Sequence, residues 1–271
     1  MLAVAFALPV ELAETRRPGE RQDIEVEGAG FATALVAGLV LALPAGAQDF
    51  PSRNIKFVVP FAAGSATDAV ARILGDHVSK TLGKPVVVEN LAGASGVIAA
   101  QNVARAEPDG HTVLITTNTT HGANQSLLKS VPYDAVGGFE AIGKIGTITL
   151  ALTTHPSVPA KTVAELVAHA KANPGKLTFG AGSSSSRIAG EMLKSLAGID
   201  LTYVPYRSNP QAITDLLGGQ ISIVFADIST TMPQVRAGKV NGLAVSTASR
   251  SALAPELPTM AEAGVPGYDL A

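Results

Sequence analysis

Short apolar runs alternate with amphipathic segments along most of this chain, and this alternation limits the possible folds more than any other feature. Ile55–Pro60 has the composition of a strand, and Thr67–Leu82 then places Val70, Ile73 and Leu74 at helical spacing. Strands that alternate with helices through short loops are typical of a mostly parallel α/β sheet, here either one large sheet or two smaller ones. Further strands are expected at 86–89, 112–116, 147–154, 177–180, 201–204, 221–226 and 243–246.

The composition excludes several classes of protein. Hydrophobic residues make up 46% of the 271 residues and charged residues 15%, which indicates a packed chain rather than a disordered one. The net charge of −2 gives no basis for binding nucleic acid. The chain has no cysteine, so disulfides, thiolate metal sites and cysteine nucleophiles are excluded. The five histidines lack the spacing of a metal site, and we expect neither a metal nor a cofactor.

An apolar segment near the start indicates export. Phe31–Leu43 is almost wholly apolar, is short for a membrane span, and is followed by Ala45-Gly46-Ala47, a pattern typical of a signal-peptidase site. We predict a signal peptide at 1–47, cleavage after Ala47 and a periplasmic protein, with a membrane anchor as the alternative. Acidic residues precede the apolar run, so residues 1–27 are interpreted as a possible extension upstream of the true start. Residues 1–47 are therefore left out of the expected fold.

The loops after the expected strands are rich in glycine, hydroxyl and amide residues. Examples are Gly64–Thr67, Asn118–Thr120 and Ser183–Ser186. Ligands of open α/β sheets bind at the carboxyl ends of the strands, where helix N-termini offer unpaired N–H groups to an anion. Each loop alone is better explained by helix capping, which prefers the same residue types. Together the loops favour a small anion or polar solute that is held by neutral donors.

Motifs of the common enzyme classes are incomplete or missing. None of the Gly-Lys pairs is followed by the serine or threonine of a phosphate-binding loop. Gly180-Ala181-Gly182 precedes a helix as a dinucleotide site would, but Ser185 occupies the position of the third glycine. The sequence contains no G-x-S-x-G nucleophile elbow. These patterns favour binding over catalysis.

Several sequence blocks occur in an order that resembles one transport family. They are "PFAAGSATDAVARIL", "GKPVVVEN", "PDGHTVLITTNTTHGAN", "NPGKLTFGAGSSSSRIAGEML" and "VPYRSNPQAITDLLGGQISIVF". From about residue 49 onward the chain resembles the Bug (TctC-like) solute-binding proteins of tripartite tricarboxylate transporters. The resemblance implies a two-lobed type II periplasmic binding protein with a mostly parallel sheet in each lobe. Such a protein captures a small carboxylate and delivers it to membrane subunits of the transporter, without catalysis.

The resemblance also implies lobe boundaries. Lobe one is expected at 49–147 and 248–271, and lobe two at 148–247. Family members continue beyond Ala271 with elements that return to lobe one, so lobe one is expected to be truncated at its C-terminal end. We expect a monomer that has no nucleic-acid partner.

The ligand-binding residues are carried over from the family by position. Gly64–Thr67 would hold one end of a carboxylate, and Ser184–Ser186 with Arg207 the other. Ser65, Arg187 and Arg207 depart from the family's usual residues, which leaves the identity of the ligand open. The full set of expected contacts is Ala63, Gly64, Ser65, Thr67, Asp68, Asn118, Thr119, His121, Ser184, Ser185, Ser186, Arg187, Tyr206, Arg207, Ser208 and Asp227.

Two other functions stay open at this point. A ligand-sensing module would use the same loops but pass its closure to a receptor, and a neighbouring gene for membrane subunits would argue against it. An exported enzyme would use the loops as an oxyanion site, and a turnover assay would reveal it.

Overall fold

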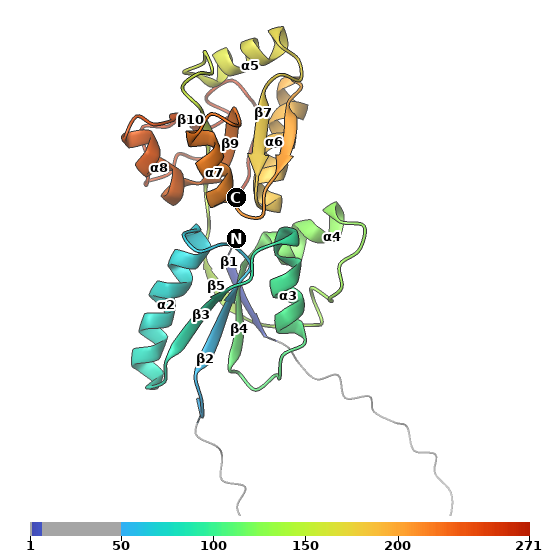
Figure 1. The fold of residues 1–271 in the computed structure, drawn as a ribbon, viewed down its shortest axis with the longest axis vertical. Coiled ribbons are helices and arrows are strands. Elements are labelled where there is room, and N and C mark those ends of the chain that lie inside the picture. Colours follow the sequence, from blue (N-terminus) through green and yellow to red (C-terminus); the bar gives the residue numbers. More distant parts are fainter. Residues whose placement is uncertain (1, 7–49) are drawn as a thin grey trace, which may run out of the picture. The chain divides into compact units, whose positions relative to one another are not determined.

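The computed structural model describes residues 2–6 and 50–271, which form two five-stranded sheets with helices on their faces (Figure 1). We call residues 2–6 and 53–147 lobe one and residues 148–271 lobe two. This architecture confirms the predicted two-lobed α/β fold class. Lobe one contains β1 (Leu2–Phe6), β2 (Ile55–Val59), α2 (Ala66–Leu82), β3 (Val86–Asn90), a 3₁₀ turn (Ala94–Gly96), α3 (Val97–Ala104), β4 (Thr112–Thr117), a π-helical turn (Thr119–Ala123), α4 (Asn124–Leu127) and β5 (Glu140–Gly146).

Lobe two follows directly in the chain, and two of its helices begin at hydroxyl caps. The Thr162 hydroxyl accepts the backbone N–H of Glu165 at the start of the first helix, and the Ser183 hydroxyl accepts that of Ser186 at the start of the second. Lobe two contains β6 (Leu150–Thr154), α5 (Val163–Ala172), β7 (Thr178–Ala181), α6 (Ser184–Ala197), β8 (Thr202–Pro205), α7 (Asn209–Leu217), β9 (Ile223–Asp227), α8 (Ile228–Arg236) and β10 (Asn241–Val245).

The two sheets share one topology. The order in lobe one is β3-β2-β4-β1-β5, and the order in lobe two, read from the other edge, is β8-β7-β9-β6-β10. In each sheet four strands run in one direction and one strand runs against them. The opposing strand is β1 in lobe one and β6 in lobe two. The carboxyl ends of the other four strands therefore lie together at one end of each sheet, where the loops that follow them can converge.

Helices cover both faces of each sheet because apolar residues occupy both faces of the strands. In β2, Phe57 and Val59 pack with Ala71 of α2, while the intervening Val58 packs with Ala100 of α3. In lobe two, one cluster joins α5 and α6 to the sheet, and separate clusters join α7 and α8 to it. Strands buried on both faces explain the continuous apolar runs in the sequence.

The assignment of residues 248–271 to lobe one is wrong in this structure. Met260, Val265 and Tyr268 are buried in the main core of lobe two. The Tyr268 hydroxyl donates to the carbonyl of Ala189 in α6 at 2.7 Å. The segment is also bridged to β10 through Val245 and Thr259. Its apolar side chains and its hydrogen bonds are thus satisfied by lobe two, and it forms no strand of the lobe-one sheet.

The N-terminus supplies a strand that the sequence did not lead us to expect. Residues 2–6 pair antiparallel with both β4 and β5. Leaving all of residues 1–47 out of the fold is therefore wrong for these five residues. The apolar run at 31–43 and the predicted cleavage site at 45–47 lie outside the described residues. Among residues 2–6 and 50–271, no helix is both long and apolar enough to span a bilayer.

Most other predicted elements are present, with shifted ends. The helix expected from Arg187 begins at Ser184, because Ser183 provides its cap. The strand expected at 147–154 begins at Leu150. Strand β5 was not predicted, because its sequence, EAIGKIG, is interrupted by glycines and lies on an exposed part of the sheet.

Candidate functional site

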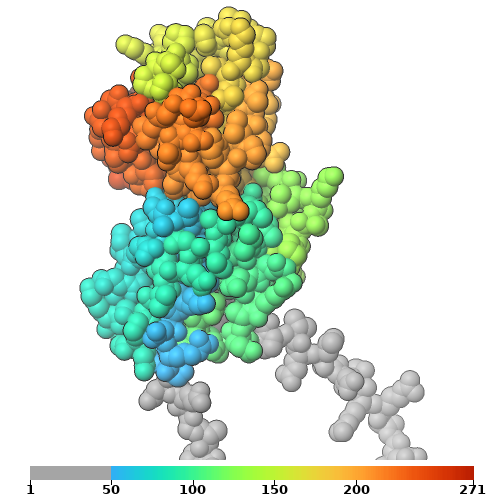
Figure 2. All heavy atoms as spheres, viewed as in Figure 1, coloured from blue at the N-terminus to red at the C-terminus, as the bar shows by residue number. Residues whose placement is uncertain are grey.

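A hollow lies between the two lobes, at the strand ends that face each other. Lobe-one atoms, coloured blue to green, and lobe-two atoms, yellow to red, meet along a narrow seam in the space-filling view (Figure 2). The hollow is small: its cavity volume is about 30 Å³, roughly the space that one water molecule takes up in the liquid, so the two lobes lie close together around it. Its lining residues are Phe61, Ser65, Thr67, Thr117, Asn118, Thr119, Ile148, Leu150, Ser183, Ser185, Ser208, Asn209, Asp227 and Ala271.

Three of the helices that begin at this hollow have a serine at the N-cap. The caps of α2, α6 and α7 are Ser65, Ser183 and Ser208, and all three line it. A helix N-terminus carries a partial positive charge and unpaired N–H groups, which favour a negatively charged group by about 0.3–1 kcal/mol each. The convergence of three such ends makes the hollow suited to an anion.

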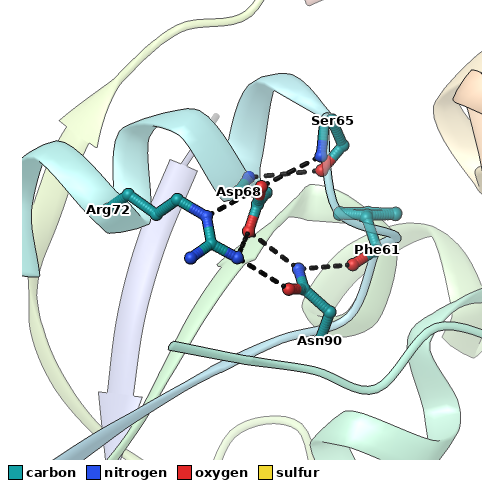
Figure 3. Close-up of polar contacts among 6 residues, drawn as sticks. Phe61, Ser65, Asp68, Arg72 and Asn90 are labelled. Atoms are coloured by element: carbon teal, nitrogen blue, oxygen red, sulfur yellow. Dashed lines mark hydrogen bonds and ion pairs between the residues drawn. The ribbon is translucent and has the colours of Figure 1, made fainter. Parts of the chain in front are cut away.

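The loop before α2 is held in place by Asp68 (Figure 3). The Asp68 carboxylate accepts the Gly64 N–H at 2.9 Å, the Asn90 amide at 2.9 Å and the Arg72 guanidinium at 3.1 Å. Burial opposes ionisation of Asp68, but the hydrogen bonds from Arg72, Gly64 and Asn90 outweigh it and lower the pKa of this carboxyl. Asp68 therefore fixes the shape of the loop and does not face the hollow.

The Asn90 amide also donates to the carbonyl of Phe61 at 3.0 Å, which ties the start of the same loop to β3. Gly64 has a φ of 82°, a conformation that glycine adopts without strain. Its N–H group is taken by Asp68, so this donor is not presented to the hollow. The glycine in the loop thus serves the turn itself.

Several hydrogen bonds cross between the lobes at the hollow. The Ala62 N–H donates to the Ser208 hydroxyl at 3.1 Å. The Ser184 hydroxyl donates to the Asn124 amide oxygen at 2.8 Å, and the Ser185 hydroxyl donates to that of Asn118 at 2.9 Å. Hydroxyl groups that the sequence assigned to a ligand therefore also join the lobes.

Some lining groups keep a hydrogen that no described residue accepts. The Ser65 and Ser208 hydroxyls are used as acceptors of N–H groups, so each hydroxyl hydrogen is left to donate. Among the described residues, neither the Thr67 hydroxyl nor the Asn209 amide nitrogen has an assigned partner, because the Asn209 bonds use its amide oxygen. These four groups, two from each lobe, are neutral donors at the hollow.

Comparison with known proteins agrees with this geometry. A family model described as "Tripartite tricarboxylate transporter family receptor" matches residues 70–271, which is most of the chain. The chain belongs to this receptor family. The match runs from within α2 through all of lobe two, so it includes most of the hollow.

Relatives within the family share both sequence and fold. The chain is 33% identical over 236 residues to Protein BugT of Bordetella pertussis, an alignment that covers 86% of this chain and 72% of BugT. It is similar to Rpa4515 of R. palustris, solved with adipate, with a TM-score of 0.76 and 33% identity over 82% of this chain and 75% of that one. MatC from Rhodopseudomonas palustris, solved with malate, gives a TM-score of 0.77 and 32% identity over 82% and 76% of the two chains. The predicted Bug-family resemblance is confirmed.

The structure brings together some of the predicted contact residues and separates others. Those that line the hollow are Ser65, Thr67, Asn118, Thr119, Ser185, Ser208 and Asp227.

The two arginines that were predicted as ligand contacts do not line the hollow. The Arg187 guanidinium lies over the Tyr203 ring at 5.2 Å from its centroid, and Arg207 is exposed. Neither side chain lines the hollow. Tyr206 donates to Asp215 at 2.7 Å and is occupied within lobe two. The expectation that Arg207 meets a distal carboxylate has no support in this arrangement.

The other predicted contacts serve the scaffold. The Ser186 hydroxyl donates to the carbonyl of Phe225 at 2.6 Å, inside lobe two. His121 lies against Phe139, with 4.7 Å between ring centroids, and burial lowers the pKa of its imidazole. Ala63 is exposed and does not line the hollow, like Gly64 and Asp68. Ser184 lies beside the hollow and bonds to the other lobe instead.

Sequence reasoning missed several lining residues. Ser183 and Asn209 are each next to a residue that was predicted as a contact, and the available signals were the cap position of Ser183 before α6 and the first position of Asn209 in α7. Phe61, Ile148 and Leu150 form an apolar part of the lining. Apolar residues of this kind look the same in a sequence whether they face a core or a cavity, so no pattern could have identified them.

Proposed function

We propose that this chain is a solute-binding protein that captures a small carboxylate between its lobes. The observation that carries the proposal is the set of free neutral donors at the hollow, contributed by Ser65 and Thr67 from lobe one and by Ser208 and Asn209 from lobe two. A carboxylate accepts several hydrogen bonds, and each bond to a charged group contributes about 1.5–3 kcal/mol. Because the donors come from both lobes, binding of the solute and closure of the lobes around it would depend on each other.

The relatives support this proposal. Rpa4515 was solved with adipate and MatC with malate, and both are small dicarboxylates. The family is one of receptors, and the proposed activity is binding without chemical conversion of the solute. The rest of the proposal is a periplasmic location after signal cleavage, a monomeric state and delivery of the solute to membrane subunits of a tripartite transporter.

The direct test is calorimetric titration of the purified chain with malate and with adipate, using the corresponding neutral diamides as controls. Micromolar binding corresponds to about 8 kcal/mol, which several charged hydrogen bonds can supply after the cost of ordering. We expect at least one carboxylate to bind and its diamide not to bind, since the diamide has no charge for the donors and helix ends to stabilise.

A matched pair of variants tests whether the carboxylate binds in the hollow. Thr67→Val removes a lining hydroxyl at nearly constant volume, and Thr81→Val makes the same change at an exposed position of the same helix, α2. Thr67→Val should weaken carboxylate binding about tenfold or more, and Thr81→Val should leave it unchanged. Equal affinities in the two variants would contradict the site. Absence of binding for every carboxylate tested would contradict the function.

A further inference from the structure

One amide side chain is fully buried at the boundary between the lobes without lining the hollow. Asn124 begins α4 and is 0% exposed. Its amide nitrogen donates to the carbonyl of Ser95 at 2.9 Å, within lobe one. Its amide oxygen accepts the Ser184 hydroxyl of lobe two at 2.8 Å. The side chain therefore bonds to one lobe through its nitrogen and to the other through its oxygen, and neither Asn124 nor Ser184 lines the hollow.

Lobe one holds this amide in one orientation. The Ser95 carbonyl can only accept a hydrogen bond, so it must face the amide nitrogen of Asn124 and not the oxygen. The amide also hydrogen-bonds the Tyr133 hydroxyl, which donates to the carbonyl of Thr120 at 2.6 Å. With its nitrogen held in this way, the amide presents its oxygen toward lobe two. Contacts within lobe one therefore prepare the acceptor for Ser184.

The turn that fixes Asn124 has a strained backbone. Ala94 and Ser95 have φ values of 47° and 53°, and among the described residues they are the only non-glycine residues with a positive φ. Such conformations persist where surrounding contacts enforce them, and they cluster at ligand sites and switch regions. A Cβ atom at the next residue, Gly96, would lie 2.8 Å from the Thr120 methyl group, so the turn is packed tightly against the segment that carries Asn124.

A neighbouring bond between the lobes differs in its position. The Ser185 hydroxyl donates to the Asn118 amide oxygen at 2.9 Å, and both residues line the hollow. A solute in the hollow can replace that bond, because it offers its own acceptors to Ser185. The bond from Ser184 to Asn124 lies outside the hollow, so a solute does not compete for it. Water has little access to it either, since Ser184 is only 3% exposed.

We propose that Asn124 is a positioning residue that latches the two lobes together, and that its bond to Ser184 sets how long a solute stays bound. The second part of this inference rests on the proposed function. The bond must break whenever the lobes separate, and both groups then return to water. The closed arrangement gains the net value of one buried hydrogen bond, which corresponds to about a threefold to tenfold change in an equilibrium constant.

The test replaces Ser184 by alanine, which removes the donor of this bond and leaves Asn124 in place. The chain has no cysteine, so spin labels can be attached to cysteines introduced at the exposed positions Thr81 of lobe one and Asp200 of lobe two. The distribution of label distances gives the ratio of closed to open molecules, and Ser184→Ala should lower this ratio about threefold to tenfold. The dissociation rate of malate or adipate, measured from the exchange broadening of its NMR signals, should rise by a similar factor.

Ser195→Ala is the matched control, because Ser195 is an exposed serine of the same helix, α6. It should leave the label distances and the dissociation rate unchanged. Asn124→Ala should act in the same direction as Ser184→Ala, and the double variant should be no more open than Asn124→Ala, since both changes remove the same bond. A merely structural role for Asn124 would lower the melting temperature in circular dichroism without changing the ratio of closed to open folded molecules.

The outcomes separate this inference from the proposed function. An unchanged ratio of closed to open molecules in Ser184→Ala overturns the latch and leaves the proposed function standing, as does a wild-type chain with no closed molecules. Slower dissociation of the solute from Ser184→Ala also overturns it, because the bond would then compete with the solute. If neither malate nor adipate binds, the proposed function fails, and the label distances still decide whether Asn124 latches the lobes.

Discussion

The two sheets have the same strand order but obtain their opposing strand in different ways. In lobe two this strand is β6, which follows β5 after a short connection and whose residues are all buried. In lobe one it is β1, which is separated from β2 by residues 7–54. One topology can therefore be completed by a strand that is near in the sequence or by one that is distant, and the distant pairing carries the larger entropic cost.

The edge strand that pairs with the opposing strand is also covered to a different extent in the two lobes. In lobe two, Leu243, Ala244 and Val245 of β10 are buried under α8 and the segment 248–271. The corresponding strand of lobe one, β5, is exposed along almost its whole length, with Ile142 at 58% exposure. The edge of the lobe-two sheet is thus covered, whereas β5 of lobe one depends mainly on backbone pairing. We expect this strand to be the least stable part of the fold.

Removal of residues 1–6 should cause the largest difference in stability between the two lobes. β1 pairs with β4 on one side and β5 on the other, and each lost ladder hydrogen bond contributes about 0.5–1.5 kcal/mol. Hydrogen exchange should show protection lost in β5 and reduced in β4, with β7 and β9 of lobe two unchanged. A chain that begins at Gln48 after signal cleavage should behave in the same way. Unchanged protection of β5 would contradict the pairing with β1.

The next largest effect on stability is expected from alanine substitutions at two matched helix glycines. Gly75 of α2 and Gly190 of α6 each face a phenylalanine of the sheet, Phe57 and Phe179. A Cβ atom at Gly190 would lie 2.2 Å from the Phe179 ring, whereas one at Gly75 would lie 3.0 Å from a Val86 methyl group. Gly190→Ala should destabilise the protein by about 3 kcal/mol through overpacking. Gly75→Ala should be near neutral, because the higher helix propensity of alanine offsets the tight contact.

Urea denaturation of the two variants measures the difference. If Gly75→Ala is as destabilising as Gly190→Ala, the packing of α2 on lobe one is as tight as that of α6 on lobe two, and the contrast between the lobes is limited to the β5 edge.

The pH dependence of stability tests the contact between the lobes. The Asp227 carboxylate accepts the backbone N–H of Ala66 from the other lobe, but burial outweighs this hydrogen bond, so the pKa of Asp227 is about 6 in the folded protein and about 3.8 when exposed. The folded state therefore holds this proton more tightly, so the stabilisation is present below about pH 4 and is lost as the pH rises to about 6. The expected loss is on the order of 3 kcal/mol. Asp227→Asn should remove this part of the pH profile, and an unchanged profile would contradict the burial of the charge.

The sequence predicted much of the fold and part of the site. Local patterns predicted the parallel strands and their helices, because both faces of strands such as β2 are apolar and caps such as Ser65 mark the helix starts. Pairings between distant segments leave no local pattern, which is why β1, β5 and the docking of 248–271 were missed. The direction of a long side chain is equally hidden: Arg187 turns to Tyr203, and nothing in its loop indicated that.

The smallest predicted effect concerns two tyrosines that tie loops to the two lobes. Tyr268 donates to the carbonyl of Ala189 at 2.7 Å, and Tyr133 donates to the carbonyl of Thr120 at 2.6 Å. Tyr268 is 1% exposed, whereas Tyr133 is only half-buried. Tyr268→Phe removes a hydrogen bond from a dry core, where water cannot replace it, and should destabilise lobe two by about 1 kcal/mol. Tyr133→Phe should have an effect of about 0.5 kcal/mol, because water can reach the freed carbonyl. Urea midpoints of both variants measure this, and equal shifts would mean that segment 248–271 is attached to lobe two less firmly than its buried side chains indicate.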